Sequence, residues 1–165
     1  GNHWSAAIAY NETLMGVKVG ADVHYSQASD STATIETGVE GIGYGLSLGY
    51  AGFTLGGSYM RSHQEDNSTV STAVAGEGEK WDVGLGYKTG PYAVSIAYTK
   101  EWSEGTIADV DDDETDVMII GGSYTLGPGV SLIGAVFSFD NNGELGTAAD
   151  QNEGWGVNAG VVVTF

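Results

Sequence analysis

The feature that most constrains this chain is a two-residue alternation of apolar side chains with polar or small ones. Trp81, Val83, Leu85 and Tyr87 alternate with glycine and charged residues, and the same pattern recurs over residues 15–25, 92–99 and 154–165. A period of two is that of a β-strand with one apolar and one polar face. The sequence therefore predicts an all-β fold.

The alternation predicts nine strands. They cover residues 2–11, 14–26, 36–50, 53–63, 79–89, 91–103, 115–126, 130–140 and 153–165. Most have ten residues or more, whereas strands of soluble proteins have about five or six. A strand that crosses a bilayer needs about 9–11 residues. The strand lengths thus favour a membrane protein.

Two long uncharged stretches raise the alternative of transmembrane helices. Residues 41–60 contain seven glycines, and residues 117–139 are interrupted by a Gly-Pro-Gly sequence. A glycine in a helix interior costs about 1 kcal/mol and a proline about 3 kcal/mol. Both stretches are therefore assigned to strands.

The predicted connections alternate between short and long. Short ones are expected near Glu12-Thr13, Ala51-Gly52, Thr89-Gly90 and Gly127-Pro128-Gly129, and long ones at 27–35, 64–78, 104–114 and 141–152. Short turns at one end and long loops at the other are typical of outer-membrane β-barrels. The sequence therefore predicts an antiparallel transmembrane β-barrel.

Aromatic residues gather near the predicted strand ends on the apolar face. We expect them to form two interfacial girdles: Trp4, Tyr10, Tyr50, Phe53, Trp81, Tyr87, Tyr92, Tyr98, Trp102, Trp155 and Phe165. A soluble β-sandwich is the alternative, and its core aromatics would occur mid-strand as often as at strand ends.

Charge and cysteine content exclude several classes of function. The chain has 22 Asp and Glu against 5 Lys and Arg, which argues against nucleic-acid binding. It has no cysteine, so disulfides and thiolate metal sites are excluded. Ionisable residues on the polar phase are expected to line a pore, because a charge facing lipid at mid-bilayer costs about 2–4 kcal/mol. These are Lys18, Asp22, His24, Lys80, Asp82, Lys88 and Glu101. Lys100 lies on the outward phase, near an interface where its head can reach water.

Two motifs suggest other chemistry. Gly45-Leu46-Ser47-Leu48-Gly49 matches a nucleophile elbow, but the strand pattern continues on both sides, so no enzyme is expected. Asp109, Asp111 and Asp113 have the spacing that opens a calcium loop, but the Gly and Glu of an EF-hand are absent. A solvated loop is one interpretation. The other is a loose Ca²⁺ or Mg²⁺ site that bridges to lipopolysaccharide phosphates, and no other cofactor is expected.

The C-terminal part resembles the last hairpin and final strand of proteobacterial porins. The resemblance rests on residues 124–137, on Asn152-Glu-Gly-Trp-Gly-Val, and on the terminal Val163-Thr164-Phe165. It implies a trimeric, 16-stranded pore in the bacterial outer membrane, with contacts to lipid and lipopolysaccharide and the C-terminus on the periplasmic side. Residues 1–165 would be a single, incomplete barrel domain that lacks the N-terminal strands.

The strand count supports the same interpretation. Single-chain bacterial barrels have an even number of strands, so nine require others, and seven more would give sixteen. The rival is a closed eight-stranded barrel over residues 14–165, whose acidic loops bind a partner or a surface. That rival leaves the alternation of residues 2–11 unexplained.

The predicted function is passive diffusion of small hydrophilic solutes. By count, 17 of the 22 acidic residues lie in or beside the long loops. A negative outer mouth would raise the local cation concentration, so cation preference is expected.

Overall fold

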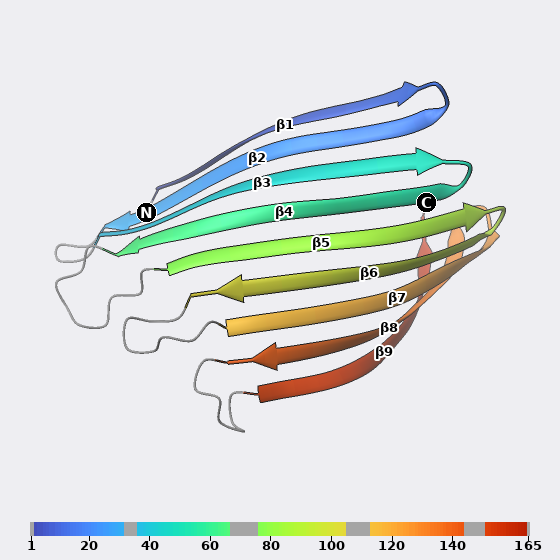
Figure 1. Cartoon of the computed structure of the whole chain (residues 1–165). Helices are drawn as coiled ribbons and strands as arrows, with labels where there is room; N and C mark the ends of the chain where they lie inside the picture. The colour runs from blue at the N-terminus through green and yellow to red at the C-terminus, as the bar shows by residue number, and fades with distance from the viewer. Residues whose placement is uncertain (1, 32–35, 67–75, 105–112, 144–150, 165) are drawn as a thin grey trace.

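The computed structural model describes residues 2–31, 36–66, 76–104, 113–143 and 151–164, and these form one antiparallel sheet (Figure 1). Its nine strands are β1 (Asn2–Leu14), β2 (Val17–Ser31), β3 (Glu36–Tyr50), β4 (Phe53–Asp66), β5 (Gly76–Thr89), β6 (Tyr92–Ser103), β7 (Asp113–Gly127), β8 (Val130–Asn142) and β9 (Gln151–Val163). Each strand pairs with the next, in the order β1 to β9. The predicted all-β class and strand number are confirmed.

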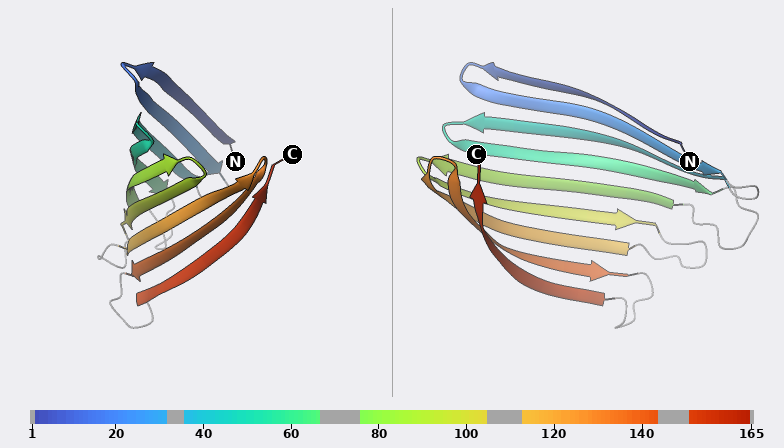
Figure 2. Two further views of the ribbon diagram at one scale, coloured as in Figure 1. Left: turned by 90° about the vertical axis from the view of Figure 1, so that its right-hand side faces the viewer. Right: turned by 180° about the vertical axis from the view of Figure 1, so that it is seen from behind.

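The sheet is curled and has two free edges. Figure 2 shows the curl from two further sides. β1 pairs with β2 from Asn2↔Ser29 to Leu14↔Val17, so the first strand is a full member of the sheet. Among the described residues, the outer edges of β1 and β9 have no strand partner.

Two-residue turns connect the strands at one end of the sheet. Met15-Gly16 and Ala51-Gly52 adopt positive φ at both positions, 50° and 85° in the first and 50° and 89° in the second. That is the geometry of type I′ turns, whose twist matches the flanking strands. The first turn was expected at Glu12-Thr13, which is wrong: these residues continue β1, and the turn forms where Gly16 can take positive φ.

At the other end the strands run further than the alternation predicted. β5 begins at Gly76 rather than 79, and β7 at Asp113 rather than 115. In both extensions the apolar-face phase carries a carboxylate, Glu77 in β5 and Glu114 in β7, so the two-residue pattern is lost although pairing continues. The long connections lie mainly outside the described residues. No helix within the described ranges is long and apolar enough to span a membrane.

The sheet has no conventional core. Of the residues whose side chains are described, only Gly43 is buried. No large side chain among them is fully buried, and many large apolar ones are exposed, including Ile8, Tyr92 and Trp155. No second sheet packs on the first within the described part of the chain, as a soluble β-sandwich would require. Contiguous exposed apolar surface of this kind needs a non-aqueous partner.

Candidate functional site

The strand register sorts the side chains onto two faces. Directly paired residues lie on the same face of a sheet, and neighbours along a strand lie on opposite faces. One row joins Ala21, Leu46, Gly57, Val83 and Tyr98 across β2–β6, and this side is the apolar face. The adjacent row joins Asp22, Gly45, Ser58, Asp82 and Thr99 and defines the polar face.

On β2–β9 the apolar face carries a band free of charge, whereas β1 places Glu12 on this face, in the register row of Ile96. From the turn end of β4–β9, the first charged residue on this face is Arg61, Glu79, Lys100, Asp116, Asp140 and Glu153, in strand order. On β6 the band runs from Tyr92 to Lys100, about 27 Å at 3.4 Å per residue. A strand tilted by 35–45° then spans about 20 Å of membrane depth, close to the apolar height of known barrels.

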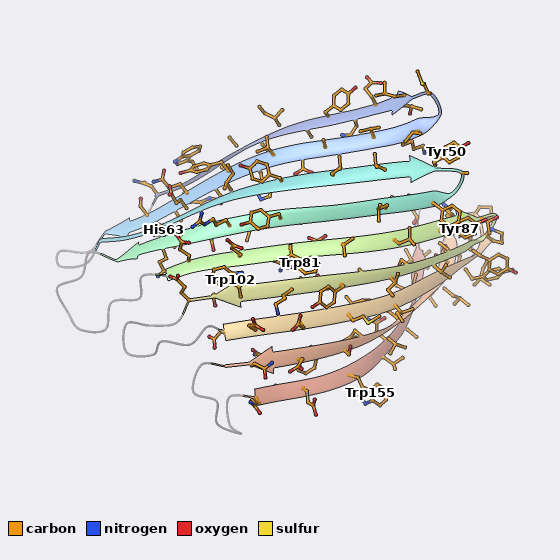
Figure 3. All side chains as sticks on the ribbon, viewed as in Figure 1. Tyr50, His63, Trp81, Tyr87, Trp102 and Trp155 are labelled. Atoms are coloured by element: carbon orange, nitrogen blue, oxygen red, sulfur yellow. The ribbon has the colours of Figure 1, made fainter. Side chains whose placement is uncertain are left out.

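Aromatic residues pair across strands at both limits of this band. At the turn end Phe53 packs on Tyr87 with ring centroids 4.4 Å apart, and Tyr92 on Tyr124 at 4.9 Å. Toward the loops the pairs are Trp4–Tyr25 at 5.0 Å and Trp81–Tyr98 at 5.2 Å. Figure 3 shows Tyr50 and Tyr87 near the turns and Trp102 near the loops.

The predicted girdle residues are therefore on the apolar face, apart from Phe165, which lies outside the described residues. Tyr10 lies in the same register row as Tyr98 and Trp155. Tyr25, Tyr44, Tyr59 and Tyr124 were not anticipated. Their phase within the alternation was the signal that could have placed them.

Between the loop-side aromatic pairs and the long connections, the apolar face carries charged residues. The Tyr25 hydroxyl donates to Glu40 Oε2 at 2.9 Å, and the Tyr98 hydroxyl donates to Asp116. In both, the carboxylate lies diagonally on the next strand, toward the loops. Each phenol ring thus stays in the apolar band while its hydroxyl reaches the polar zone.

The basic residues of this zone are paired with carboxylates. Lys100 Nζ lies 3.0 Å from Glu114 Oε2 and 3.9 Å from Asp116 Oδ2, on the outward phase predicted for it. Arg61 forms an ion pair with Glu77. Arg61 and His63 share the apolar-face phase with Tyr59, although His63 was expected in a loop or on the lumen side.

The polar face carries all seven ionisable residues predicted from phase. Lys80 Nζ lies 3.2 Å from Glu101 Oε2, and His24 Nδ1 lies 3.7 Å from Asp22 Oδ2. The Ser58 hydroxyl donates to Asp82. Lys18 and Lys88 lie near the turn end of the same face. Whether this face lines a lumen remains a prediction.

The polar face carries charges of both signs. Among the side chains that the structure describes, it holds three lysines together with Asp22, Asp82, Glu101 and Asp113. Mixed charges that line a pore order water and discriminate between solutes by charge and size. Phe137 and Phe139 also lie on this face, opposite Gly156 and Gly154, and the sequence analysis did not foresee them.

A hollow of about 500 Å³ spreads over β1–β6. Its polar lining includes Asn11, Asp22, Ser47, Ser58, Asp82 and Ser95, all polar-face residues. Glycines of β2–β5 form much of the remaining lining. The polar face therefore offers an open, hydrogen-bonding surface rather than a closed pocket.

Neither alternative chemistry gains support from the geometry. Ser47 lies within β3, without the strand-to-helix turn of a nucleophile elbow. Asp109 and Asp111 lie outside the described residues, and Asp113 is exposed at the start of β7. The described residues contain no group of three or more side chains suited to a metal ion.

Comparisons with known proteins agree with this geometry. OmpT, an outer membrane protein of Vibrio cholerae, superposes with a TM-score of 0.66 at 12% identity, over 97% of this chain and 54% of OmpT. Its loop L8 deletion mutant gives the same score over 53% of that protein. Pseudomonas aeruginosa OccK10 (OpdN) gives 0.51 at 10% identity, over 99% of this chain and 62% of OccK10.

The chain thus spans about half the length of OmpT. These identities are low, so the likeness shows the fold alone. No curated protein sequence matches the chain. The sequence model of the Gram-negative porin family, however, matches residues 1–145. Together with the two-faced sheet, this match shows that the chain belongs to the Gram-negative porin family.

Proposed function

We propose that this chain forms part of the wall of a water-filled channel through which small hydrophilic solutes diffuse across the outer membrane. The observation that carries the proposal is the division of the sheet into an apolar face with a charge-free band over β2–β9 and a polar face with charges of both signs. Placing the polar face against lipid would put the carboxylates of Asp22 and Asp82 at the depth of the charge-free band, where an ionised side chain in hydrocarbon is destabilising. If water lies on that side, this cost disappears. The charges of the polar face are then hydrated and line a path for small solutes.

The free edges of β1 and β9 indicate how the channel would be completed. Unpaired backbone groups are not tolerated in hydrocarbon, so both edges need partner strands. We propose that further strands of the same polypeptide close the barrel and that three barrels form a homotrimer. The rival closed eight-stranded barrel receives no support, because β1 pairs with β2 along its whole length.

We further propose that the C-terminus faces the periplasm. β9 runs from the long-connection end to the two-residue-turn end of the sheet (Figure 1). In outer-membrane barrels the short turns are periplasmic and the long loops extracellular. The ionic zone above the apolar band would then lie at the outer leaflet, next to lipopolysaccharide. A loose Ca²⁺ or Mg²⁺ site at Asp109, Asp111 and Asp113 remains part of the proposal.

The proposed cation preference is modest. Among the acidic residues counted near the loops whose side chains the structure describes, six lie on the apolar face, outside the proposed lumen, namely Glu77, Glu79, Glu114, Asp116, Asp140 and Glu153. Their field must act across the wall, and salt screens exposed charges beyond about 10 Å at 0.1 M. Selectivity for cations should therefore weaken as the salt concentration rises.

Single-channel recording of the native polypeptide in planar bilayers tests the function. We expect stepwise, ohmic conductance and a reversal potential in a KCl gradient that favours K⁺ at low salt and shifts toward zero at high salt. A folded, inserted protein without conductance would contradict the channel and favour a closed barrel. Anion preference at low salt would contradict only the proposed selectivity.

A further inference from the structure

Three polar-face side chains of β2 are each paired directly with a glycine of β3. Lys18, Asp22 and His24 are paired directly with Gly49, Gly45 and Gly43. The one glycine among the polar-face residues of β2 up to His24, Gly20, is instead paired with Ser47. Long side chains on one strand thus meet bare backbone on the next.

These side chains lie flat over the glycines. A Cβ built on Gly43 would collide with the imidazole of His24, and one on Gly45 with the carboxylate of Asp22. A Cβ on Gly49 would lie 3.3 Å from Cβ of Lys18. Gly43 is buried, whereas the His24 side chain is 43% exposed and that of Asp22 is 49% exposed. The ring therefore covers the backbone of β3 and leaves one side open.

The other neighbouring strand offers no such place. The direct partners of His24 and Asp22 on β1 are Ala7 and Ala9, which already carry a Cβ. If the space over Gly43 is filled, the ring must change rotamer and leave the wall. The clash involves the end of a side chain rather than backbone, so the strand pairing itself can remain.

We propose that Gly43 and Gly45 are positioning residues, which hold His24 and Asp22 flat against the wall and so set the free width of the lumen and the depth to which its charges project. The inference rests on the proposed channel function. The same arrangement recurs at the other side of the sheet, where the ring of Phe137 lies over Gly156 and that of Phe139 over Gly154.

The test compares Gly43→Ala with Gly41→Ala in the complete native protein. Gly41 lies on the same face of the same strand, but a Cβ there would have ordinary contacts, 3.5 Å from Ser26 Oγ and 3.6 Å from the Arg61 carbonyl oxygen. We expect Gly43→Ala to lower single-channel conductance and to slow the entry of the larger neutral sugars into liposomes, while Gly41→Ala behaves as wild type.

Removal of the displaced ring should reverse the loss. The double variant His24→Ala/Gly43→Ala is expected to recover at least the wild-type conductance. A deficit that persists without the ring, or equal conductance of folded Gly43→Ala and Gly41→Ala channels, would overturn the inference. For Gly45→Ala the displaced group is a carboxylate, so cation preference should increase, and Asp22→Asn should remove that increase.

A readout independent of conduction separates this inference from the proposed function. Carbethoxylation of His24 by diethylpyrocarbonate, followed by mass spectrometry of the folded protein, should be faster in Gly43→Ala than in Gly41→Ala. Equal rates would overturn the positioning role, whatever the channel does. Wild-type protein without channels would overturn the proposed function, and with it the effect on lumen width.

Discussion

A side chain on this sheet meets one of two environments, and the face on which it lies decides which. Ile96 pairs with Leu85 and Ile120 in the middle of the charge-free band. Ser95, one residue earlier, pairs with Gly86 and Gly121 on the polar face. The two residues are neighbours on β6, so they lie at nearly the same depth, and their side chains point to opposite faces of the sheet. The same side chain placed at each position therefore compares the two environments.

Lysine substitutions at these two positions should differ in their effect on stability. Ile96→Lys places an ammonium group in hydrocarbon and should lower the free energy of unfolding by about 2–4 kcal/mol. Ser95→Lys places the same group in water and should change it by no more than about 0.5 kcal/mol. Denaturant titrations of the native protein in lipid vesicles measure both, and equal destabilisation would refute the assignment of faces.

At the scale of the strands, the sequence predicted most of the arrangement. Unbroken alternation located all nine strands, because one face must match lipid and the other water. It failed where that requirement ends. At Glu77 and Glu79 the outward phase is ionisable too, so the alternation vanishes while β5 continues. The Gly43–His24 contact was also beyond prediction, because it depends on the register between strands rather than on either strand alone.

The outer edge of β1 should be paired in the native particle. All of its described residues are exposed in this chain, yet hydrocarbon does not tolerate a free strand edge. We expect the backbone amides of β1 to be protected from hydrogen exchange as strongly as those of β5, which has neighbours on both sides. Exchange of alternate β1 amides at the rate of exposed amides would show that the edge is open.

For the whole molecule, membership of the porin family fixes the class, and the two faces supply the physical mechanism. In the proposed channel the apolar band would account for insertion, and the polar face, which carries charges of both signs, would account for conduction. Both depend on the same two-residue period. The central claim is therefore that water, rather than protein or lipid, occupies the polar face.

Cysteine accessibility tests this claim most directly, because the chain has no cysteine of its own. On β4, Thr54→Cys and Ser62→Cys lie on the polar face, and Leu55→Cys and Tyr59→Cys lie on the apolar face. A membrane-impermeant, charged thiol reagent should label the first pair and lower single-channel conductance when it reacts. The second pair should remain unlabelled and conduct normally. Labelling of Leu55→Cys and Tyr59→Cys, with Thr54→Cys and Ser62→Cys protected, would contradict the account.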